Sequence, residues 1–142
     1  MKPLPDFVSH VTGIRDLLAA AGFNVHVGDV QVADPPLPYV MIQATTGLPE
    51  AVNLAVDQVE VSESLNVTTV DTTPLNAMRT VNMVRNALAG AVLTIPGRVC
   101  FPLRLTASQG VIVDREVTLT STRQHPAYSV DTWRVSSTPT EE

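Results

Sequence analysis

The fold is decided by residues 71–90, DTTPLNAMRTVNMVRNALAG, which join a strand-like run to an amphipathic helix with a clearly marked start. Thr73 can cap this helix by offering its hydroxyl to the unpaired amides of the first turn. Pro74 then occupies the first helical position, where an N–H is not needed, and Gly90 stands where a left-handed cap is expected. Apolar residues at steps of three and four predict a buried stripe of Leu75, Met78, Val81, Val84 and Leu88.

A second helix is predicted nearer the N-terminus, over residues 5–21. An acidic residue in its first turn, Asp6, suits the helix dipole, and Gly22 ends the helix. The stripe that we expect to be buried consists of Phe7, Val11, Ile14, Leu18 and Ala21. His10 falls off this stripe, so we expect it to be exposed to solvent.

Alternating apolar residues predict a short strand and a turn within residues 23–32, where the pattern breaks at Gly28, and further strands over residues 39–44, 59–70, 99–105 and 127–135. Glu63 interrupts the third strand, which therefore has either an exposed middle or a bulge, and a bulge is also expected near Asp131. Residues 47–57 and 107–126 are expected to be loops. The short connections predict an α+β fold with an antiparallel sheet of about four to five strands and two helices packed on one face. Residues 1–142 form one domain, with loose termini at about 1–4 and 137–142.

The surface is poor in charge. Only 16% of the residues are charged, against about 25% in a typical protein, so a neighbouring subunit could cover this surface at a lower desolvation cost. The same composition also fits a surface that is merely rich in threonine. The net charge of −5 argues against a protein that grips nucleic acid through its phosphates, although an acidic surface can still face DNA.

Several function classes lack the residues that they need. Cys100 is the only cysteine, so no disulfide can form within the chain and no zinc cluster is available; we interpret it as a packing residue. The sequence shows no signal peptide and no apolar run long enough to span a membrane. We therefore expect a chain that is soluble and cytosolic at synthesis.

Catalytic, metal and cofactor sites are also not predicted. The three histidines, His10, His26 and His125, are far apart and share no motif. Asp114 and Glu116 flank Arg115 in a polar segment, which indicates a solvated turn rather than a carboxylate pair in a cleft. With no nucleophile motif and no phosphate-binding glycine loop, we expect that the protein is not an enzyme.

A set of weak motifs gains value from its order along the chain. These motifs are PLPYV at 36–40, VTTVDTTP at 67–74, VRNALAG at 84–90, VDR at 113–115, and a closing strand with Tyr128, Asp131 and Trp133. Over residues 4–137 the chain resembles the tail terminators, or tail-completion proteins, a group of minor tail proteins of long-tailed bacteriophages.

The resemblance implies an α+β subunit of a ring, typically a hexamer, that caps the tail tube and stops its polymerisation. The implied partners are further copies of the chain, the tail tube protein and a head-closure or connector protein, while DNA passes through the lumen without specific binding. The implied location is the tail–neck junction of the virion, after assembly in the host cytoplasm. Another head–tail connector, such as a head-closure or adaptor protein, remains an alternative. A small ligand-binding or enzymatic α+β domain is a more distant one.

Candidate contact residues lie in two of the expected loops. Glu50 and Asp57 could face the lumen or a neighbouring subunit, or could be ordinary solvated surface. The apolar island Val111, Ile112 and Val113 could contact a partner, or could be a short core strand. These five residues are the sites that the sequence offers.

Overall fold

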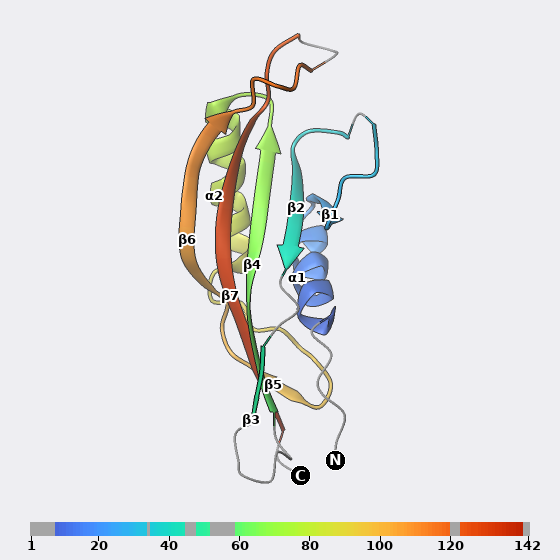
Figure 1. Ribbon diagram of the computed structural model, residues 1–142, viewed down its shortest axis with the longest axis vertical. Coiled ribbons are helices and arrows are strands. Elements are labelled where there is room, and N and C mark those ends of the chain that lie inside the picture. The colour runs from blue at the N-terminus through green and yellow to red at the C-terminus, as the bar shows by residue number, and fades with distance from the viewer. Residues whose placement is uncertain (1–7, 34, 45–47, 52–58, 120–122, 141–142) are drawn as a thin grey trace.

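The computed structural model describes residues 8–33, 35–44, 48–51, 59–119 and 123–140. Within them the chain forms two helices and seven strands (Figure 1). In chain order these are α1 (Val8–Ala20), β1 (Asn24–Val27), β2 (Tyr39–Ala44), β3 (Leu48–Ala51), β4 (Val59–Asp71), α2 (Pro74–Leu88), β5 (Arg98–Cys100), β6 (Arg104–Val113) and β7 (Ala127–Pro139).

The seven strands form one mixed sheet around two long central strands. Its order is β1-β2-β4-β7-β5, with β3 also paired to β4 and β6 also paired to β7. β1 runs parallel to β2, whereas the other pairs are antiparallel. The α+β class is confirmed, but the prediction of a purely antiparallel sheet was wrong. The proline-rich connection carries the chain from the end of β1 back to the level at which β1 began, so that β2 runs parallel to β1.

The strand count exceeds the expected four to five for two local reasons. β3 lies inside the segment 47–57, which was expected to be a loop. The strand predicted over 99–105 is divided by Pro102, so that β5 ends at Cys100 and β6 begins at Arg104. β6 then runs on to Val113, through residues that were expected to belong to a long loop.

Each helix packs on its own part of the curled sheet. α2 contacts β4, β6 and β7, whereas α1 contacts β1 and β2, and the two helices touch each other. The prediction placed both helices together on one face of the sheet and did not foresee that each would cover different strands. The core lies between the helices and the sheet and includes Ile14, Leu18, Val40, Ile42, Leu65, Val84, Leu88 and Trp133.

The start of α2 confirms the signals in its sequence. The hydroxyl of Thr73 accepts a hydrogen bond from the Asn76 amide at 3.1 Å, and Pro74 opens the helix. The predicted stripe was wrong in its first turn, because Leu75 and Met78 are 57% and 55% exposed. Thr80 is buried instead, since its hydroxyl donates to Asp71 at 2.8 Å and turns this side of the helix towards the sheet.

β7 is regular and longer than expected. It pairs with β4 without interruption from Val61–Ser137 to Asp71–Ala127, so the bulge predicted near Asp131 was wrong. The register shifts lie in β6 instead, where extra residues oppose β7 twice. β7 also extends to Pro139, beyond the end of the strand that was expected at residue 135.

Candidate functional site

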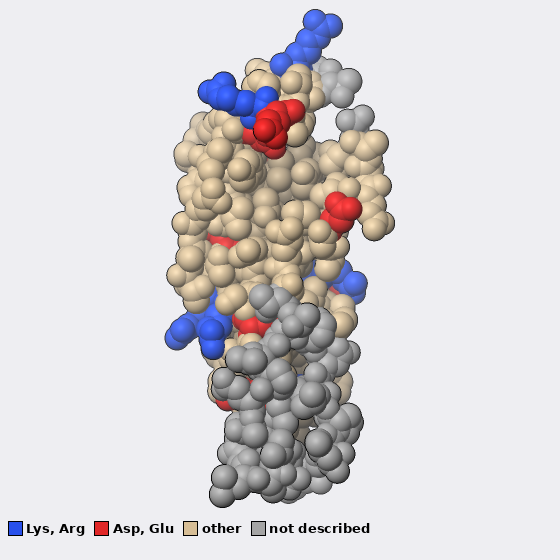
Figure 2. Space-filling view, in the orientation of Figure 1, with Lys and Arg blue, Asp and Glu red and all other residues tan. Residues whose placement is uncertain are grey.

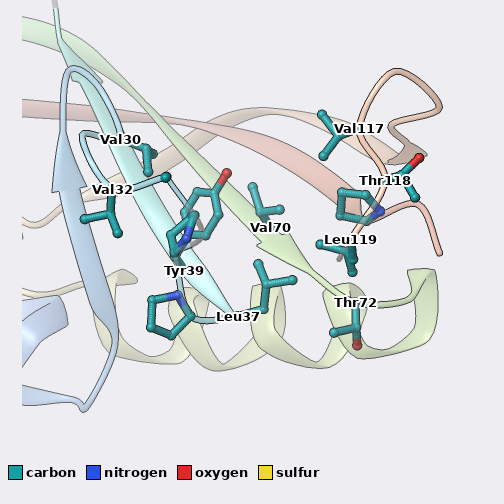
Figure 3. Close-up of a pocket in the computed structure, with 13 residues that line it drawn as sticks. Val30, Val32, Leu37, Tyr39, Val70, Thr72, Val117, Thr118 and Leu119 are labelled. Carbon is teal, nitrogen blue, oxygen red and sulfur yellow. The ribbon is translucent and has the colours of Figure 1, made fainter. Parts of the chain in front are cut away.

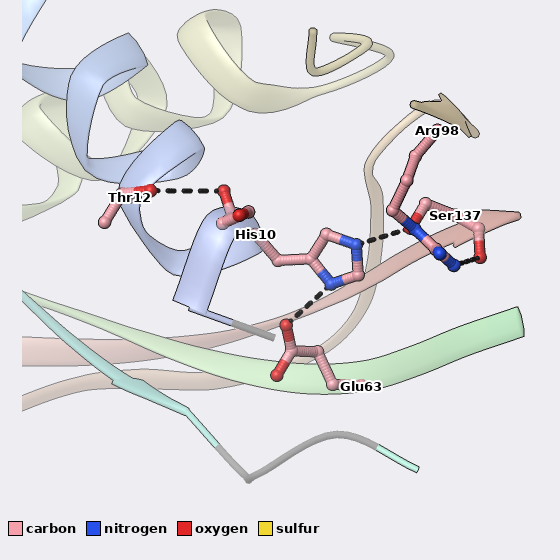
Figure 4. Close-up of polar contacts among 6 residues, drawn as sticks. His10, Thr12, Glu63, Arg98 and Ser137 are labelled. Atoms are coloured by element: carbon pink, nitrogen blue, oxygen red, sulfur yellow. Dashed lines mark hydrogen bonds and ion pairs between the residues drawn. The ribbon is translucent and has the colours of Figure 1, made fainter. Parts of the chain in front are cut away.

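A chain of buried polar contacts ties the first turn of α1 to the sheet (Figure 4). The Nδ1 atom of His10 lies 2.9 Å from Glu63 Oε1 in β4, and its Nε2 atom lies 2.7 Å from Ser137 Oγ in β7. The Nε atom of Arg98 in β5 donates to the same Ser137 Oγ at 2.7 Å. The expectation of an exposed His10 was therefore wrong. The two interpretations of Glu63, an exposed strand middle and a bulge, were also wrong. His10 and Glu63 are both buried, and each supplies the hydrogen-bond partner that the other needs.

This network has the order acid, imidazole and hydroxyl that hydrolases use. Its environment is different, because Ser137, His10 and Glu63 are only 0%, 1% and 3% exposed. A substrate cannot reach the Ser137 hydroxyl, because this residue is not exposed to solvent. In this conformation the arrangement acts as a structural tie between α1, β4, β5 and β7.

A second polar network joins α2 to β6 and β7. The Nε and Nη2 atoms of Arg85 each donate to one carboxylate oxygen of Asp131 at 2.8 Å, a bidentate geometry. The same Nη2 also donates to Ser108 Oγ at 2.8 Å. The hydrogen bond with Asp131 raises the pKa of Arg85, against the effect of burial. Asp131, in the closing-strand motif, is thus a buried partner of α2 rather than an exposed site residue.

The opposite face of β4 and β7 carries no helix and little charge. Between the paired positions Asn66–Thr132 and Val70–Tyr128, its side chains are uncharged. We call this surface the open face and define it by Tyr39, Met41, Asn66, Thr68, Val70, Tyr128, Val130 and Thr132. In Figure 2 the middle of this side of the molecule is almost entirely free of charged atoms. Such a surface can be covered by a neighbour without the desolvation of ions.

β6 borders the open face and is an edge strand. It pairs with β7 on one side only, and among the described residues no other strand pairs with it. Residues 105–113 contain neither a charged residue nor a proline, which are the usual features that stop an edge from pairing with another chain. The two register shifts in β6 are its only such protection.

The five candidate residues from the sequence have different outcomes. Val111, Ile112 and Val113 all lie in β6, where Ile112 is 38% exposed and the other two are half-buried. Glu50 lies in β3 and pairs with Glu60 of β4, but its side chain lies outside the described residues. Asp57 also lies outside them. The structure therefore brings the three apolar candidates to one exposed edge.

A cavity of about 720 Å³ lies at the end of the sheet where β4 leads into α2 (Figure 3). Its walls come from the β1–β2 connection and from the β6–β7 connection, and Tyr39 and Val70 lie between them. Burial and, to a lesser extent, the nearby carboxylate of Asp114 raise the pKa of Tyr39. The Asp114 carboxylate also accepts a hydrogen bond from the Glu116 amide at 3.2 Å, which agrees with the turn expected there.

Cofactor and metal sites find no support in the described part of the chain. No group of three His, Cys, Asp or Glu residues there could hold a metal ion. Cys100 belongs to the core, as expected, and burial raises the pKa of its thiol while Arg98 opposes the shift. None of the described helices is long and apolar enough to cross a membrane.

Sequence reasoning missed the buried networks, the open face and the cavity. Two signals were available. Glu63 occupied a position in the same phase as Val61, Leu65 and Val67, and Asp131 occupied the phase of Trp133 and Val135. A charged residue at a core position indicates a buried partner elsewhere in the chain.

Comparisons with known proteins give a structural likeness and no match in sequence. No protein-family model and no curated protein sequence matches this chain. Among solved structures it is similar to a chain of the "Virion of native gene transfer agent (GTA) particle", with a TM-score of 0.54 over 88% of this chain and 92% of that one. The two sequences are 15% identical, so the likeness shows a shared fold.

Proposed function

We propose that this chain is a structural protein of a phage-like virion that assembles with copies of itself into a ring and works without a catalytic step. The observation that carries the proposal is the uncharged open face, continuous with the unpaired edge of β6. The fold shared with a chain of a gene transfer agent virion supports the same conclusion.

The proposed station is the end of the tail. The ring, a hexamer in the family that the sequence resembles, caps the tail tube, stops its growth and joins the tail to a head-closure or connector protein at the tail–neck junction. In such a ring the β6 edge of one copy meets a different surface on the next copy. Contacts of this head-to-tail kind close into rings.

DNA passes through the lumen in this proposal without being held. The net charge of −5 supports this role, since an acidic wall repels phosphates and lets DNA slide. The chain has a single lysine and scattered arginines, which is too few for a continuous phosphate-binding track.

Negative-stain electron microscopy of the purified protein, alone and mixed with tail tubes, tests the proposal. We expect rings that bind one end of each tube. Rings that ignore tubes and bind portal complexes would instead identify another connector, such as a head-closure or adaptor protein. A strict monomer whose melting temperature rises with a small ligand would contradict the proposal and favour a ligand-binding or enzymatic domain.

Ile112→Asp tests the edge on which the ring depends. A buried unpaired carboxylate is strongly unfavourable, so we expect a folded monomer where the wild type forms rings. Val92→Asp is the matched control, because Val92 is 56% exposed and lies outside β6 and the open face. Rings of normal appearance from Ile112→Asp would show that β6 is not in the subunit contact.

A further inference from the structure

The cavity at the end of the sheet fits a short extended peptide better than a charged ligand. Among the described residues its lining is uncharged and includes Val32, Pro36, Leu37, Val117 and Leu119. Its volume of about 720 Å³ lies in the usual range of ~300–1,000 Å³ for binding pockets. Figure 3 shows the two connections on either side of Tyr39 and Val70, so the cavity is a groove between two chain segments.

Residues 2–7 of this chain, KPLPDF, have the matching chemistry and lie outside the described residues. Pro3 and Pro5 fix their own φ angles and favour the extended polyproline conformation. Such a segment loses little conformational entropy on docking, and it is commonly bound by apolar grooves that contain an aromatic ring. Leu4, between the prolines, supplies an apolar side chain.

The charges at the groove also match this segment. Asp114 lies close enough to Tyr39 to raise its pKa, and the Asp114 carboxylate accepts a hydrogen bond from the backbone amide of Glu116. The segment contains Lys2, the single lysine of the chain. A lysine two residues before Leu4 could place its ammonium group beside the Asp114 carboxylate.

The segment cannot reach the groove of its own subunit. The first turn of α1 is bonded to Glu63, whereas the groove lies at Val70, seven residues along β4 and so roughly 23 Å away. Leu4 lies four positions before Val8, the first residue of α1, and four positions of extended chain span at most about 14 Å. Figure 1 shows the first turn of α1 and the β1–β2 connection towards opposite ends of the molecule.

We propose that residues 2–7 of one copy dock in this groove of a second copy and hold neighbouring subunits together. The proposal rests on the self-assembly that the proposed function requires, but not on the station of the ring in the virion. The occupant of the groove is a segment of an identical chain, so every subunit both donates its residues 2–7 and receives those of a neighbour.

Disulfide trapping tests this contact in the full chain. On a Cys100→Ala background, one variant carries Leu4→Cys and a second carries Val32→Cys, which lines the groove and is 54% exposed. Val92→Cys replaces Val32→Cys in the control mixture, since Val92 is 56% exposed and distant from the groove. We expect about tenfold more disulfide-linked dimer with Val32→Cys than with Val92→Cys, because docking raises the local thiol concentration.

Two results would overturn the inference. One is equal cross-linking of the Val32→Cys and Val92→Cys mixtures while the wild-type protein still assembles, which leaves the proposed function intact. The other is a disulfide within one chain in the Leu4→Cys/Val32→Cys double variant, which would show that the segment returns to its own subunit. A wild-type protein that stays monomeric by light scattering would remove the proposed function and this inference together.

Discussion

The two faces of β4 and β7 use charge in opposite ways. The face that the helices cover contains three buried carboxylates, Glu63, Asp71 and Asp131, each with a hydrogen-bond partner on another element or beside it. The open face has no charged side chain over its central rows. Soluble proteins usually show the reverse distribution. In this chain, charge specifies how the helices dock on the sheet, and its absence outside leaves a surface that a neighbouring subunit can cover.

The largest expected effect comes from breaking the buried network on the covered face. His10→Ala leaves the Glu63 carboxylate buried without its imidazole partner, and we expect a loss of roughly 3–5 kcal/mol in the free energy of unfolding. Urea denaturation measures this loss. A change as small as that of an exposed surface substitution, about 0.5 kcal/mol or less, would show that the network does not hold α1 on the sheet.

A smaller effect is expected at the second network. Asp131→Asn removes the charge from the bidentate contact with Arg85, and charged hydrogen bonds of this kind contribute about 1.5–3 kcal/mol. The matched control is Asp114→Asn in the β6–β7 turn, which we expect to change the unfolding free energy by less than about 0.5 kcal/mol. Equal losses in the two variants would contradict the distinction between the buried Asp131 and the half-buried Asp114.

How far these features follow from the sequence depends on the range of the interactions. Thr73 and Pro74 act within one helical turn, so they predicted the start of α2 to the residue. The limits of β2 follow equally well from its apolar run after the prolines. His10 and Glu63 are 53 positions apart, and each alone looks like a solvated residue. Only the tertiary fold shows that they are partners.

The same reasoning applies to the candidate site. The apolar island 111–113 was visible in the sequence, but a short core strand and an exposed edge have the same pattern there. The edge position depends on the pairing of β6 with β7 on one side, which is a property of the whole sheet. The uncharged open face needed the register of β2, β4 and β7 before its residues could be grouped.

A charge placed on the open face should affect folding little and assembly strongly. Thr68 lies in β4 between Met41 and Val130 on the neighbouring strands. For Thr68→Lys we expect a change of about 0.5 kcal/mol or less in the unfolding free energy. Light scattering should nevertheless show a fall to the 15.2 kDa mass of one chain, since assembly would bury the ammonium group. A variant that assembles like the wild type would remove the open face from the contact.

The smallest effect concerns the groove at high pH. Burial, helped by Asp114, raises the pKa of Tyr39, so the folded protein favours the neutral phenol. This contribution to stability is complete below the ordinary tyrosine pKa of about 10 and is lost as the pH rises through the raised value. In an ultraviolet titration, Tyr39→Phe should lose the tyrosine step that lies above the ordinary pKa.

A control for that titration is Asp114→Asn. Removing the carboxylate should move the late tyrosine step back only part of the way, because burial is the larger cause of the shift. A titration curve that is the same in Tyr39→Phe and in the wild type, apart from its amplitude, would show that Tyr39 ionises normally and is not buried at the groove.

Hydrogen–deuterium exchange of β6 tests the central claim most directly, namely that the chain assembles through this edge and the open face beside it. In the wild-type protein we expect the amides of residues 105–113 that do not pair with β7 to be protected, and in Ile112→Asp to exchange rapidly. The covered face should be equally protected in both proteins. Rapid exchange along β6 in assembled wild-type protein would contradict the claim.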